Sequence, residues 1–305
     1  MKILVTGSSG MVGTYLCERL LKEGHDVIGV DWRPNKWNEG VNAITINIDL
    51  RDKARVLSVL PSGIDIIVHL AANARVHDLV LDPSLARDNF ETLFSILEYA
   101  RESGIKRFMF ASSREVYGDT SQNIHFEGGV KIKNCKSPYA ASKISGEAMI
   151  YSYQQCYRID FCIFRYSNIY GMYDESNRVV PLFIKNCKIG EDLVIFGKNK
   201  ILDFTYIVDA IDGTVLLLNK FNTIKNEVYN LATGYGVSLL ELAKIIKAEM
   251  NSDSRICIGS SRIGEVTKDI ADISKIKAVT GYNPKVFIQE GVKKSIKWYQ
   301  GNIFR

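Results

Sequence analysis

The sequence predicts an α/β protein built on a doubly wound parallel sheet, with a smaller lobe formed by the C-terminal part of the chain. The first two-thirds of the 305 residues alternate short apolar runs with longer amphipathic ones. This alternation is typical of successive βαβ units, which build parallel sheets. A glycine-rich turn follows the first apolar run, and after Arg165 the alternation gives way to longer loops. These observations favour one large sheet domain and a second, less regular part.

Six short apolar runs are the expected strands of the sheet, and the amphipathic stretches between them are the expected helices. The strands are expected at 2–6, 26–30, 43–46, 65–70, 107–112 and 160–165, and the helices at 11–22, 52–59, 83–103 and 138–157. The Asp82–Pro83 pair favours a helix start, because Asp caps free N–H groups and Pro tolerates the first turn. Farther on, we expect short strands at 193–197 and 203–208, a helix at 209–220, and a strand at 228–232 that returns to the main sheet.

Composition and charge argue against a membrane protein, a secreted protein and a nucleic-acid-binding protein. Apolar residues make up 46% of the chain and charged residues 24%, as in ordinary globular proteins. No run of about 18 apolar residues is present, and the chain begins directly with an apolar strand, so we expect neither a membrane span nor a secretory signal. The net charge of +5 is spread along the chain. The densest basic run, 131–136, fits a solvated loop better than a nucleic-acid site.

The cysteines and histidines do not form a recognisable site in the sequence. The six cysteines show neither CxxC pairing nor metal-ligand spacing, and the four histidines are scattered. His69, in VHLAA, fits a packed strand end better than a catalytic role. We therefore expect free thiols, no metal site and a cytoplasmic protein.

The glycine-rich turn has the spacing G-x-x-G-x-x-G at Gly7, Gly10 and Gly13. Glycines there let the backbone turn tightly and approach a pyrophosphate, and the N-terminus of the following helix supplies N–H groups. Asp31 closes the second strand, where a carboxylate accepts the ribose hydroxyls of NAD and repels the 2′-phosphate of NADP. Asp49 follows the third strand and could meet the adenine amino group. The pattern predicts a Rossmann domain that binds NAD.

The expected domain organisation follows from this assignment. Residues 1–165 are expected to form the NAD-binding Rossmann domain, together with a returning segment near 203–232. The remainder of 166–305 is expected to form a smaller, discontinuous substrate-binding lobe.

A tyrosine and a lysine four residues apart are candidates for catalysis. In a helix, this spacing puts Tyr139 and Lys143 on one face, within reach of a shared ligand. Free tyrosine has a pKa of about 10, and a neighbouring ammonium would favour the phenolate that a general base needs. Ser112 and Ser113 end an apolar strand in the stretch FASSREVYGDT, at a sheet edge where α/β enzymes keep their chemistry.

The chain resembles the extended short-chain dehydrogenases/reductases over nearly its whole length, because five motifs occur in the order seen in that family. They are TGSSGMVG, HLAA at 69–72, SSREVYGD at 112–119, YAASK at 139–143 and RYSNIYG at 165–171. Residues 262–284 resemble the C-terminal signature of the nucleotide-sugar branch. The resemblance implies an NAD domain with a nucleotide-sugar lobe. It also implies a homodimer that packs through two helices per subunit, here 89–103 and 139–157.

By position, the resemblance implies that Tyr139 is the catalytic base and that Ser113 binds the 4-hydroxyl of the sugar. It implies that Lys143 holds the nicotinamide ribose and lowers the pKa of Tyr139. The other implied cofactor contacts are Gly7, Gly10, Met11, Val12, Gly13, Asp31, Asp49, Leu50, Leu70, Ala71, Ala72, Asn89, Ser112 and Tyr166. The implied substrate contacts are Ser113, Arg114, Asn168, Arg178 and Arg262, although Arg262 in RIGE also fits a surface arginine. Leu202 departs from the family pattern, which usually has Arg there.

Members of this branch share a first step, in which hydride leaves C4 of the sugar for NAD⁺ while the base takes the hydroxyl proton. A 4,6-dehydratase resembles this chain but has a proton-donating Asp where Arg114 stands, and a guanidinium does not release its proton. A UDP-glucuronate decarboxylase is compatible with Glu115, which matches the catalytic glutamate of those enzymes. Epimerisation needs only Ser113, Tyr139, Lys143 and tightly held NAD. The resemblance therefore favours a 4-epimerase of a UDP-hexose or a UDP-uronic acid.

Arg114 has two interpretations. It could form a bidentate ion pair with the C5 carboxylate of UDP-glucuronate, or it could pair with Glu115, Asp119 or a backbone carbonyl.

A non-catalytic NAD-binding sensor is a further alternative from another class, although such proteins typically lose the tyrosine or the lysine.

Overall fold

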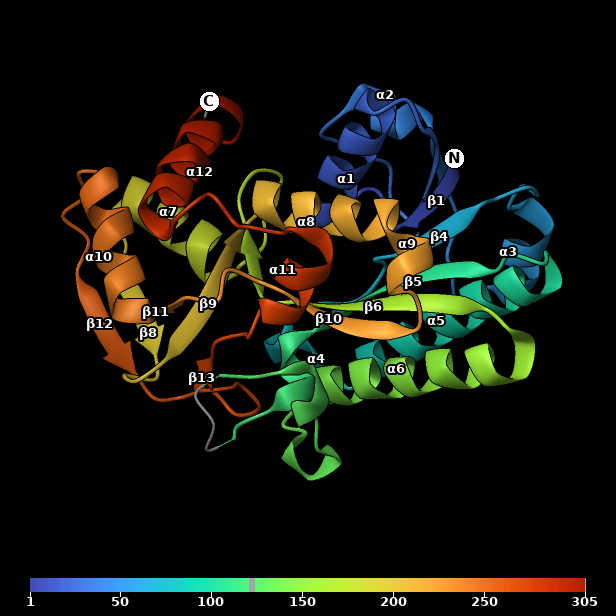
Figure 1. The fold of residues 1–305 in the computed structure, drawn as a ribbon. Helices are drawn as coiled ribbons and strands as arrows, with labels where there is room; N and C mark the ends of the chain where they lie inside the picture. Colours follow the sequence, from blue (N-terminus) through green and yellow to red (C-terminus); the bar gives the residue numbers. More distant parts are fainter. Residues whose placement is uncertain (121–123, 305) are drawn as a thin grey trace.

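A seven-stranded parallel sheet forms the centre of the larger part of the molecule in the computed structural model, which describes residues 1–120 and 124–304 (Figure 1). The strand order is β3-β2-β1-β4-β5-β6-β10, so the order reverses between β1 and β4. Ligands of doubly wound sheets bind in the crevice outside the carboxyl ends of the strands at such a reversal. The strands are β1 (Lys2–Thr6), β2 (Asp26–Asp31), β3 (Thr45–Asn47), β4 (Ile66–His69), β5 (Arg107–Ser113), β6 (Asp160–Tyr166) and β10 (Glu227–Leu231).

Two apolar cores lie on opposite faces of this sheet. Along β1, Ile3 and Val5 belong to one core and Leu4 to the other, because successive side chains of a strand point to opposite faces. Both faces are covered by helices, which explains why the strands are nearly continuous apolar runs. Helices α1 (Met11–Lys22) and α8 (Ile207–Asn219) cover the first face, and α3 (Lys53–Val59), α5 (Ser84–Glu102) and α6 (Pro138–Tyr157) cover the second.

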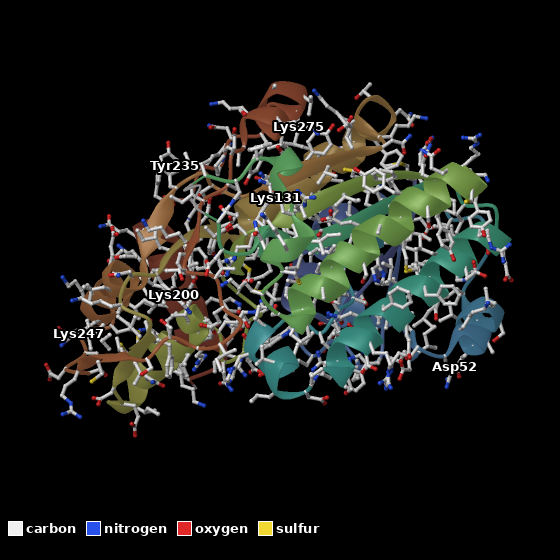
Figure 2. The ribbon with its side chains drawn as sticks, turned by 90° about the horizontal axis from the view of Figure 1, so that it is seen from below. Asp52, Lys131, Lys200, Tyr235, Lys247 and Lys275 are labelled. Carbon is white, nitrogen blue, oxygen red and sulfur yellow. The ribbon has the colours of Figure 1, made fainter. Side chains whose placement is uncertain are left out.

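The smaller part is built around β9 (Ile201–Tyr206), which pairs with three other short strands. Its partners are β7 (Asn168–Tyr170) and β13 (Lys268–Asp269), both parallel to it, and β11 (Gly236–Ser238), antiparallel. A separate pair joins β8 (Leu193–Phe196) to β12 (Ile256–Gly259). Figure 2 shows the two parts side by side, with Asp52 at the end of the larger one and Lys247 at the far end of the smaller one. Helices α7 (Val179–Ile189), α10 (Leu239–Glu249), α11 (Ser274–Thr280) and α12 (Ile288–Asn302) complete the C-terminal half of the chain.

Some elements differ in extent or place from the predicted ones. The helix predicted at 83–103 is preceded by a separate short helix, α4 (Val76–Leu81), and Asp82 accepts a hydrogen bond from the N–H of Ser84 at 3.0 Å. The strand predicted at 203–208 is β9 and pairs within the smaller part, so the return to the main sheet begins later than predicted, with α8. The strand predicted at 228–232 is β10, which pairs with β6. The remaining short elements are α2 (Glu39–Ala43), α9 (Phe221–Ile224), η1 (Arg114–Tyr117), η2 (Glu127–Gly129) and η3 (Ile132–Asn134).

Three aromatic side chains hold two loops and α12 together, and we call them the aromatic cluster. The rings of Trp37, after β2, and Tyr173, after β7, lie 5.9 Å apart, and they lie 5.3 and 5.5 Å from the ring of Trp298 on α12. Tyr173 has a left-handed backbone, with φ of 68°, and its hydroxyl donates to Glu18 of α1 at 2.8 Å. The aromatic cluster therefore fixes the loop after β2 relative to the loop after β7.

The six cysteines are free, as predicted. Within residues 1–120 and 124–304, no helix combines the length and the apolar composition that crossing a membrane requires.

Candidate active site

Two adjoining cavities open at the carboxyl ends of the sheet strands. The first, of about 360 Å³, is lined by residues that follow β1, β2, β3 and β4, and we call it the sheet cavity. The second, of about 300 Å³, is lined by residues of both parts of the molecule, and we call it the lobe cavity. Leu70 and Ala72, which follow β4, line both cavities, so the two cavities meet at these residues.

The glycine turn after β1 contributes Gly7 and Gly10 to the sheet cavity. Gly7 has φ of 74°, in the left-handed region that favours glycine. A Cβ on Gly13 would lie 2.0 Å from the backbone oxygen of Gly7, whereas a Cβ on Gly10 would come only within 3.4 Å of that oxygen. The turn therefore packs against the start of α1 without a side chain between them, as a pyrophosphate cradle requires.

Asp31 lines the sheet cavity at the end of β2, and backbone N–H groups hold its carboxylate. Ser9 and Arg33 each donate a backbone N–H to it at 3.0 Å. Burial raises the pKa of Asp31, and these N–H groups act in the opposite direction. A fixed carboxylate beside a glycine turn fits the ribose and pyrophosphate of a dinucleotide.

The other predicted cofactor residues divide between the two cavities and the core. Met11 packs in the apolar core, and neither Met11 nor Gly13 lines either cavity. Asp49, Leu50, Ala71 and Asn89 line the sheet cavity, and Val12, Ser112, Tyr139, Lys143 and Tyr166 line the lobe cavity.

Two of these residues already have protein partners. Asp49 accepts hydrogen bonds from the guanidinium of Arg51, the shortest at 2.6 Å, and Arg51 also lines the sheet cavity. Asn89 accepts the backbone N–H of Asn73 at 2.7 Å and donates to the backbone oxygen of Asn73 at 3.0 Å. Sequence reasoning missed Arg51, although it stands two residues after Asp49.

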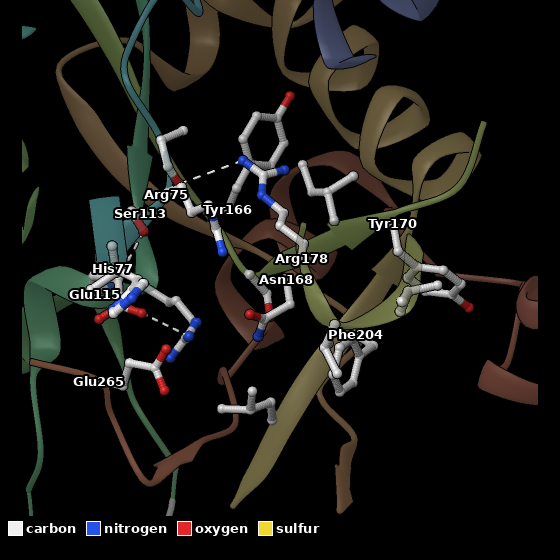
Figure 3. A pocket seen from close by; sticks show the side chains of 18 of the residues that line it. Arg75, His77, Ser113, Glu115, Tyr166, Asn168, Tyr170, Arg178, Phe204 and Glu265 are labelled. Carbon is white, nitrogen blue, oxygen red and sulfur yellow. Dashed lines mark hydrogen bonds and ion pairs between the residues drawn. The ribbon is translucent and has the colours of Figure 1, made fainter. Parts of the chain in front are cut away.

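Ser113, Tyr139 and Lys143 form one wall of the lobe cavity. Figure 3 shows Ser113 on the left, near Glu115 and across from Arg178. The hydroxyl of Ser137 accepts the N–H of Ala140 at 3.1 Å and so caps α6, which places Tyr139 and Lys143 one turn apart beside the end of β5. Tyr139 is hydrogen-bonded to Ser113. The ammonium of Lys143 donates to a backbone oxygen of β5 at 2.8 Å.

Burial is the main cause of the pKa shifts of Tyr139 and Lys143. Burial raises the pKa of Tyr139, and the hydrogen bond with Ser113 and the positive charge of Arg178 act in the opposite direction. Burial lowers the pKa of Lys143 to about 8, and the negative charge of Glu147 opposes this shift. The wall thus holds a phenol and an ammonium that both respond strongly to any further charge placed beside them.

A buried ion pair supports this wall from behind. The carboxylate of Glu147, one turn after Lys143, accepts bidentate hydrogen bonds from Arg165 at 2.9 and 2.7 Å. It also accepts the hydroxyl of Ser112 at 2.5 Å. Sequence reasoning missed Glu147 and Arg165, because only the packing of α6 against β6 brings them together.

Arg114 is paired with carboxylates of the protein. Its Nη2 lies 2.7 Å from Oε1 of Glu115, one of the partners considered from the sequence, and its Nε lies 3.7 Å from Asp269 of β13, which was not considered. Asp119 pairs instead with Lys136 at 3.4 Å. Burial raises the pKa of Glu115, and it raises that of Asp269 to about 7, while Arg114 opposes both shifts. The charge of Arg114 is therefore already balanced within the site.

The smaller part supplies the facing wall of the lobe cavity. Asn168 of β7 donates to a backbone oxygen of β9 at 2.9 Å. Arg178, at the start of α7, extends across the cavity and donates to the backbone oxygen of Ala74 at 3.5 Å (Figure 3). The guanidinium of Arg262 lies 3.7 Å from the ring centre of Phe196. The structure thus brings all the predicted substrate residues to one cavity, Arg262 included.

Sequence reasoning missed two charged residues of this wall, Lys200 and Glu265. The ammonium of Lys200 pairs with Glu265, and both residues line the lobe cavity. A signal for Lys200 was available, because alternate residues of a strand share a face. Lys200 therefore lies on the same side of the chain as Leu202 and Phe204, which line the cavity too.

Comparisons with known proteins agree with this geometry. Residues 3–232 match the NAD dependent epimerase/dehydratase family. The chain is 33% identical over 308 residues to a putative UDP-glucose 4-epimerase of Methanocaldococcus jannaschii, covering 98% of this chain and 99% of the relative. It is 29% identical to a UDP-glucuronate 4-epimerase of Thermodesulfobacterium geofontis, covering 98% and 96% of the two chains. The crystal structure of a UDP-glucose 4-epimerase of Thermotoga maritima with UDP-glucose matches with a TM-score of 0.90 at 29% identity, covering 99% of this chain and 100% of that one. The chain therefore belongs to the NAD dependent epimerase/dehydratase family.

Proposed function

We propose that the protein is an NAD-dependent 4-epimerase of a UDP-linked sugar that acts through a transient 4-keto sugar. The observation that carries this proposal is the position of Ser113, Tyr139 and Lys143 on the wall of the lobe cavity, which meets the sheet cavity at Leu70 and Ala72. A dinucleotide in the sheet cavity and a nucleotide sugar in the lobe cavity would meet beside these side chains. The similarity to UDP-glucose and UDP-glucuronate 4-epimerases supports the same reaction.

The residues of the site have defined roles in this reaction. When bound, NAD would supply the hydride chemistry at C4 of the sugar. Tyr139 takes the proton of the 4-hydroxyl, and Ser113, which is hydrogen-bonded to Tyr139, aligns that hydroxyl. Because burial raises the pKa of Tyr139, its phenolate depends on nearby positive charge, which Arg178 and Lys143 provide. Tyr139 gives the proton back after the keto sugar has turned, which completes the inversion.

The residues that would hold NAD line the sheet cavity and the adjoining part of the lobe cavity. The turn at Gly7, Gly10 and Gly13 would face the pyrophosphate, and Asp31 would accept the adenosine ribose hydroxyls. Lys143 lines the lobe cavity, where it would reach the nicotinamide ribose.

The site favours a UDP-hexose over a UDP-uronic acid. Arg114, the candidate partner for a C5 carboxylate, is already paired with Glu115 and faces Asp269. Nη1 of Arg114 is buried and has no hydrogen-bond partner among the described residues. A uronic acid bound there would place a third carboxylate beside two buried ones, which like-charge repulsion and desolvation disfavour.

The experiment that tests the proposal follows the sugar directly. The purified protein with NAD⁺ is incubated separately with UDP-glucose, UDP-N-acetylglucosamine and UDP-glucuronate, and the products are resolved by NMR. We expect inversion at C4 with unchanged mass. Retention of NAD without conversion of any of these sugars would contradict the proposal and would favour a non-catalytic NAD-binding sensor.

Decarboxylation of UDP-glucuronate is a second candidate, because Glu115 is buried against the lobe cavity and burial raises its pKa. Its Oε2 is buried and has no hydrogen-bond partner among the described residues. In the NMR experiment, release of carbon dioxide and formation of a UDP-pentose from UDP-glucuronate alone would indicate this reaction.

We propose in addition that the protein is a homodimer formed through α5 and α6. These helices pack against each other on one face of the sheet, and Phe90 and Phe94 of α5 are exposed one turn apart. Exposed apolar side chains on neighbouring helices favour burial against a second copy.

The six free thiols support a reducing, cytoplasmic location.

A further inference from the structure

The lobe cavity carries an excess of positive charge. Three carboxylates, of Glu115, Asp174 and Glu265, line it. They face six lysine and arginine side chains, which are Arg75, Arg114, Lys143, Arg178, Lys200 and Arg262. A cavity with this imbalance is suited to an anionic ligand, because partly buried charges are only weakly screened by solvent.

Lys200 is the cation that the protein has fixed most firmly on the wall formed by β9. The residue is only 7% exposed, and its backbone is held by hydrogen bonds with the oxygen of Gly197 at 3.4 Å and the N–H of Leu239 at 3.1 Å. The side chain passes close to Gly197, where an added Cβ would lie 3.5 Å from Cε of Lys200. The lysine stem therefore lies against the backbone of Gly197.

A single carboxylate balances both Lys200 and Arg262. Glu265 pairs with the ammonium of Lys200, and its Oε1 lies 3.7 Å from Nη1 of Arg262. These three side chains, which we call the Lys200 cluster, carry a net charge of about +1 with Lys and Arg protonated. A largely buried ion pair is weak evidence for stability, because desolvation offsets its attraction. The arrangement instead suits a site in which a ligand anion supplies the missing negative charge.

We propose that Lys200 binds the diphosphate of the nucleotide sugar together with Arg262, a role that rests on the proposed function. Lys200 directly precedes β9 and stands two residues before Leu202, and both residues line the lobe cavity. Leu202 is apolar and stands where the resembled family usually has Arg. Lys200 therefore supplies, two residues before Leu202, the positive charge that this part of the cavity wall would otherwise lack.

The test compares UDP with uridine, which lacks the diphosphate, by calorimetric titration of the NAD-loaded protein. Lys200→Met is expected to weaken UDP binding by roughly 10- to 100-fold, as for loss of a charged hydrogen bond, and to leave uridine binding and NAD content unchanged. Lys198→Met is the matched control, because Lys198 is exposed and does not line the cavity. Unchanged UDP binding in Lys200→Met, or equal losses for UDP and uridine, would overturn the inference.

Two further variants keep the inference falsifiable. Lys200→Met leaves Glu265 without its buried partner, so the double variant Lys200→Met/Glu265→Gln removes both charges and should show the same selective loss of UDP binding. Lys200→Met/Leu202→Arg restores a cation on the same face of β9. Recovery of UDP binding would support the inference that a cation at position 200 or at position 202 can bind the diphosphate. Failure to recover would contradict it. Failure of the unaltered protein to bind UDP would instead refute the proposed function itself.

Discussion

The ammonium of Lys143 lies 5.9 Å from the ring centre of Tyr139 and is anchored at 2.8 Å to the backbone oxygen of Ala111. The lysine is therefore fixed to β5 and acts on the phenol through space, without a direct hydrogen bond between the two. Burial lowers the pKa of Lys143 to about 8, so its positive charge is present at neutral pH and is lost as the pH rises above that value.

Replacement of Lys143 by Met should slow turnover without unfolding the protein. The substitution removes the ammonium beside Tyr139, so we expect kcat to fall by roughly 10²- to 10⁴-fold, the range of a lost acid–base contribution. The pH at which the phenolate forms, and with it the acidic limb of the pH–rate profile, should also move to higher pH, because a nearby positive charge favours the phenolate. Steady-state kinetics between pH 6 and pH 10 check this, and an unchanged pH profile would contradict it.

Tyr139→Phe should abolish epimerisation and leave cofactor binding intact. The substitution removes the hydroxyl that is hydrogen-bonded to Ser113, and we expect a loss in kcat of at least about 10³-fold. The matched control is Tyr166→Phe, since Tyr166 lines the same cavity but its hydroxyl is bonded to Thr214 at 2.6 Å. Comparable losses in the two variants, measured by NMR of the sugar products, would rule out Tyr139 as the specific base.

Gly13→Ala should disrupt the turn that faces the proposed cofactor. The new Cβ would lie 2.0 Å from the backbone oxygen of Gly7, and overpacking of this kind costs about 1–3 kcal/mol. We expect a lower free energy of unfolding and loss of bound NAD. Gly301→Ala on α12 is the control, because an added Cβ there would meet nothing within 4 Å and Gly301 lines neither cavity. Equal NAD content in the two variants would show that the close approach at Gly13 has no effect on the cofactor.

His69 should make the protein less stable in acid. The ring is buried beside Phe110, its Nδ1 lies 2.9 Å from Oγ1 of Thr6, and burial lowers its pKa to about 3. In the unfolded chain the ring binds a proton below its ordinary pKa of about 6.5, so folding stability is present above that pH and is lost as the pH falls towards 3. At pH 5 this group alone should cost about 2 kcal/mol relative to neutral pH.

The measurement for His69 is a pair of urea unfolding series at pH 8 and pH 5, for the unaltered protein and for His69→Gln. The variant should lose less stability between the two pH values than the unaltered protein, whatever its absolute stability. Identical pH dependence in both would show that His69 is not the titrating group.

Phe94→Glu should separate the proposed dimer. The side chain is exposed on α5, and a carboxylate there would have to be desolvated in an interface between two copies. Sedimentation velocity should give a dimer for the unaltered protein and a monomer for the variant. Phe126→Glu replaces another exposed phenylalanine, at the start of η2, and it should remain dimeric.

Features that depend on neighbouring residues in the chain could be predicted from the sequence. The glycine spacing at Gly7 and Gly13 predicts a turn between a strand and a helix, and the turn lies between β1 and α1. Tyr139 and Lys143 are close in the sequence and lie on one helix, α6. The strands of the main sheet could be located because both faces are buried, which leaves long apolar runs. The sheet to which β9 belongs could not be predicted, because short apolar strands of either part have the same local pattern.

The charge pairs of the site could not be predicted, because tertiary packing alone brings their members together. Arg114 meets Asp269 only when β13 packs beside β9, and Lys200 meets Glu265 across 65 residues of chain. A sequence reveals that such charges exist but not which of them neutralise one another. The sequence alone therefore leaves both interpretations of Arg114 open.

The aromatic cluster of Trp37, Tyr173 and Trp298 has a consequence for how ligands enter and leave. Its rings join the loop that follows Asp31, which lines the sheet cavity, to the loop that leads to Arg178, which lines the lobe cavity. Parting the loops would expose large aromatic surfaces to water, at a cost on the order of several kcal/mol. The two loops are therefore expected to move together with α12 when a ligand enters or leaves.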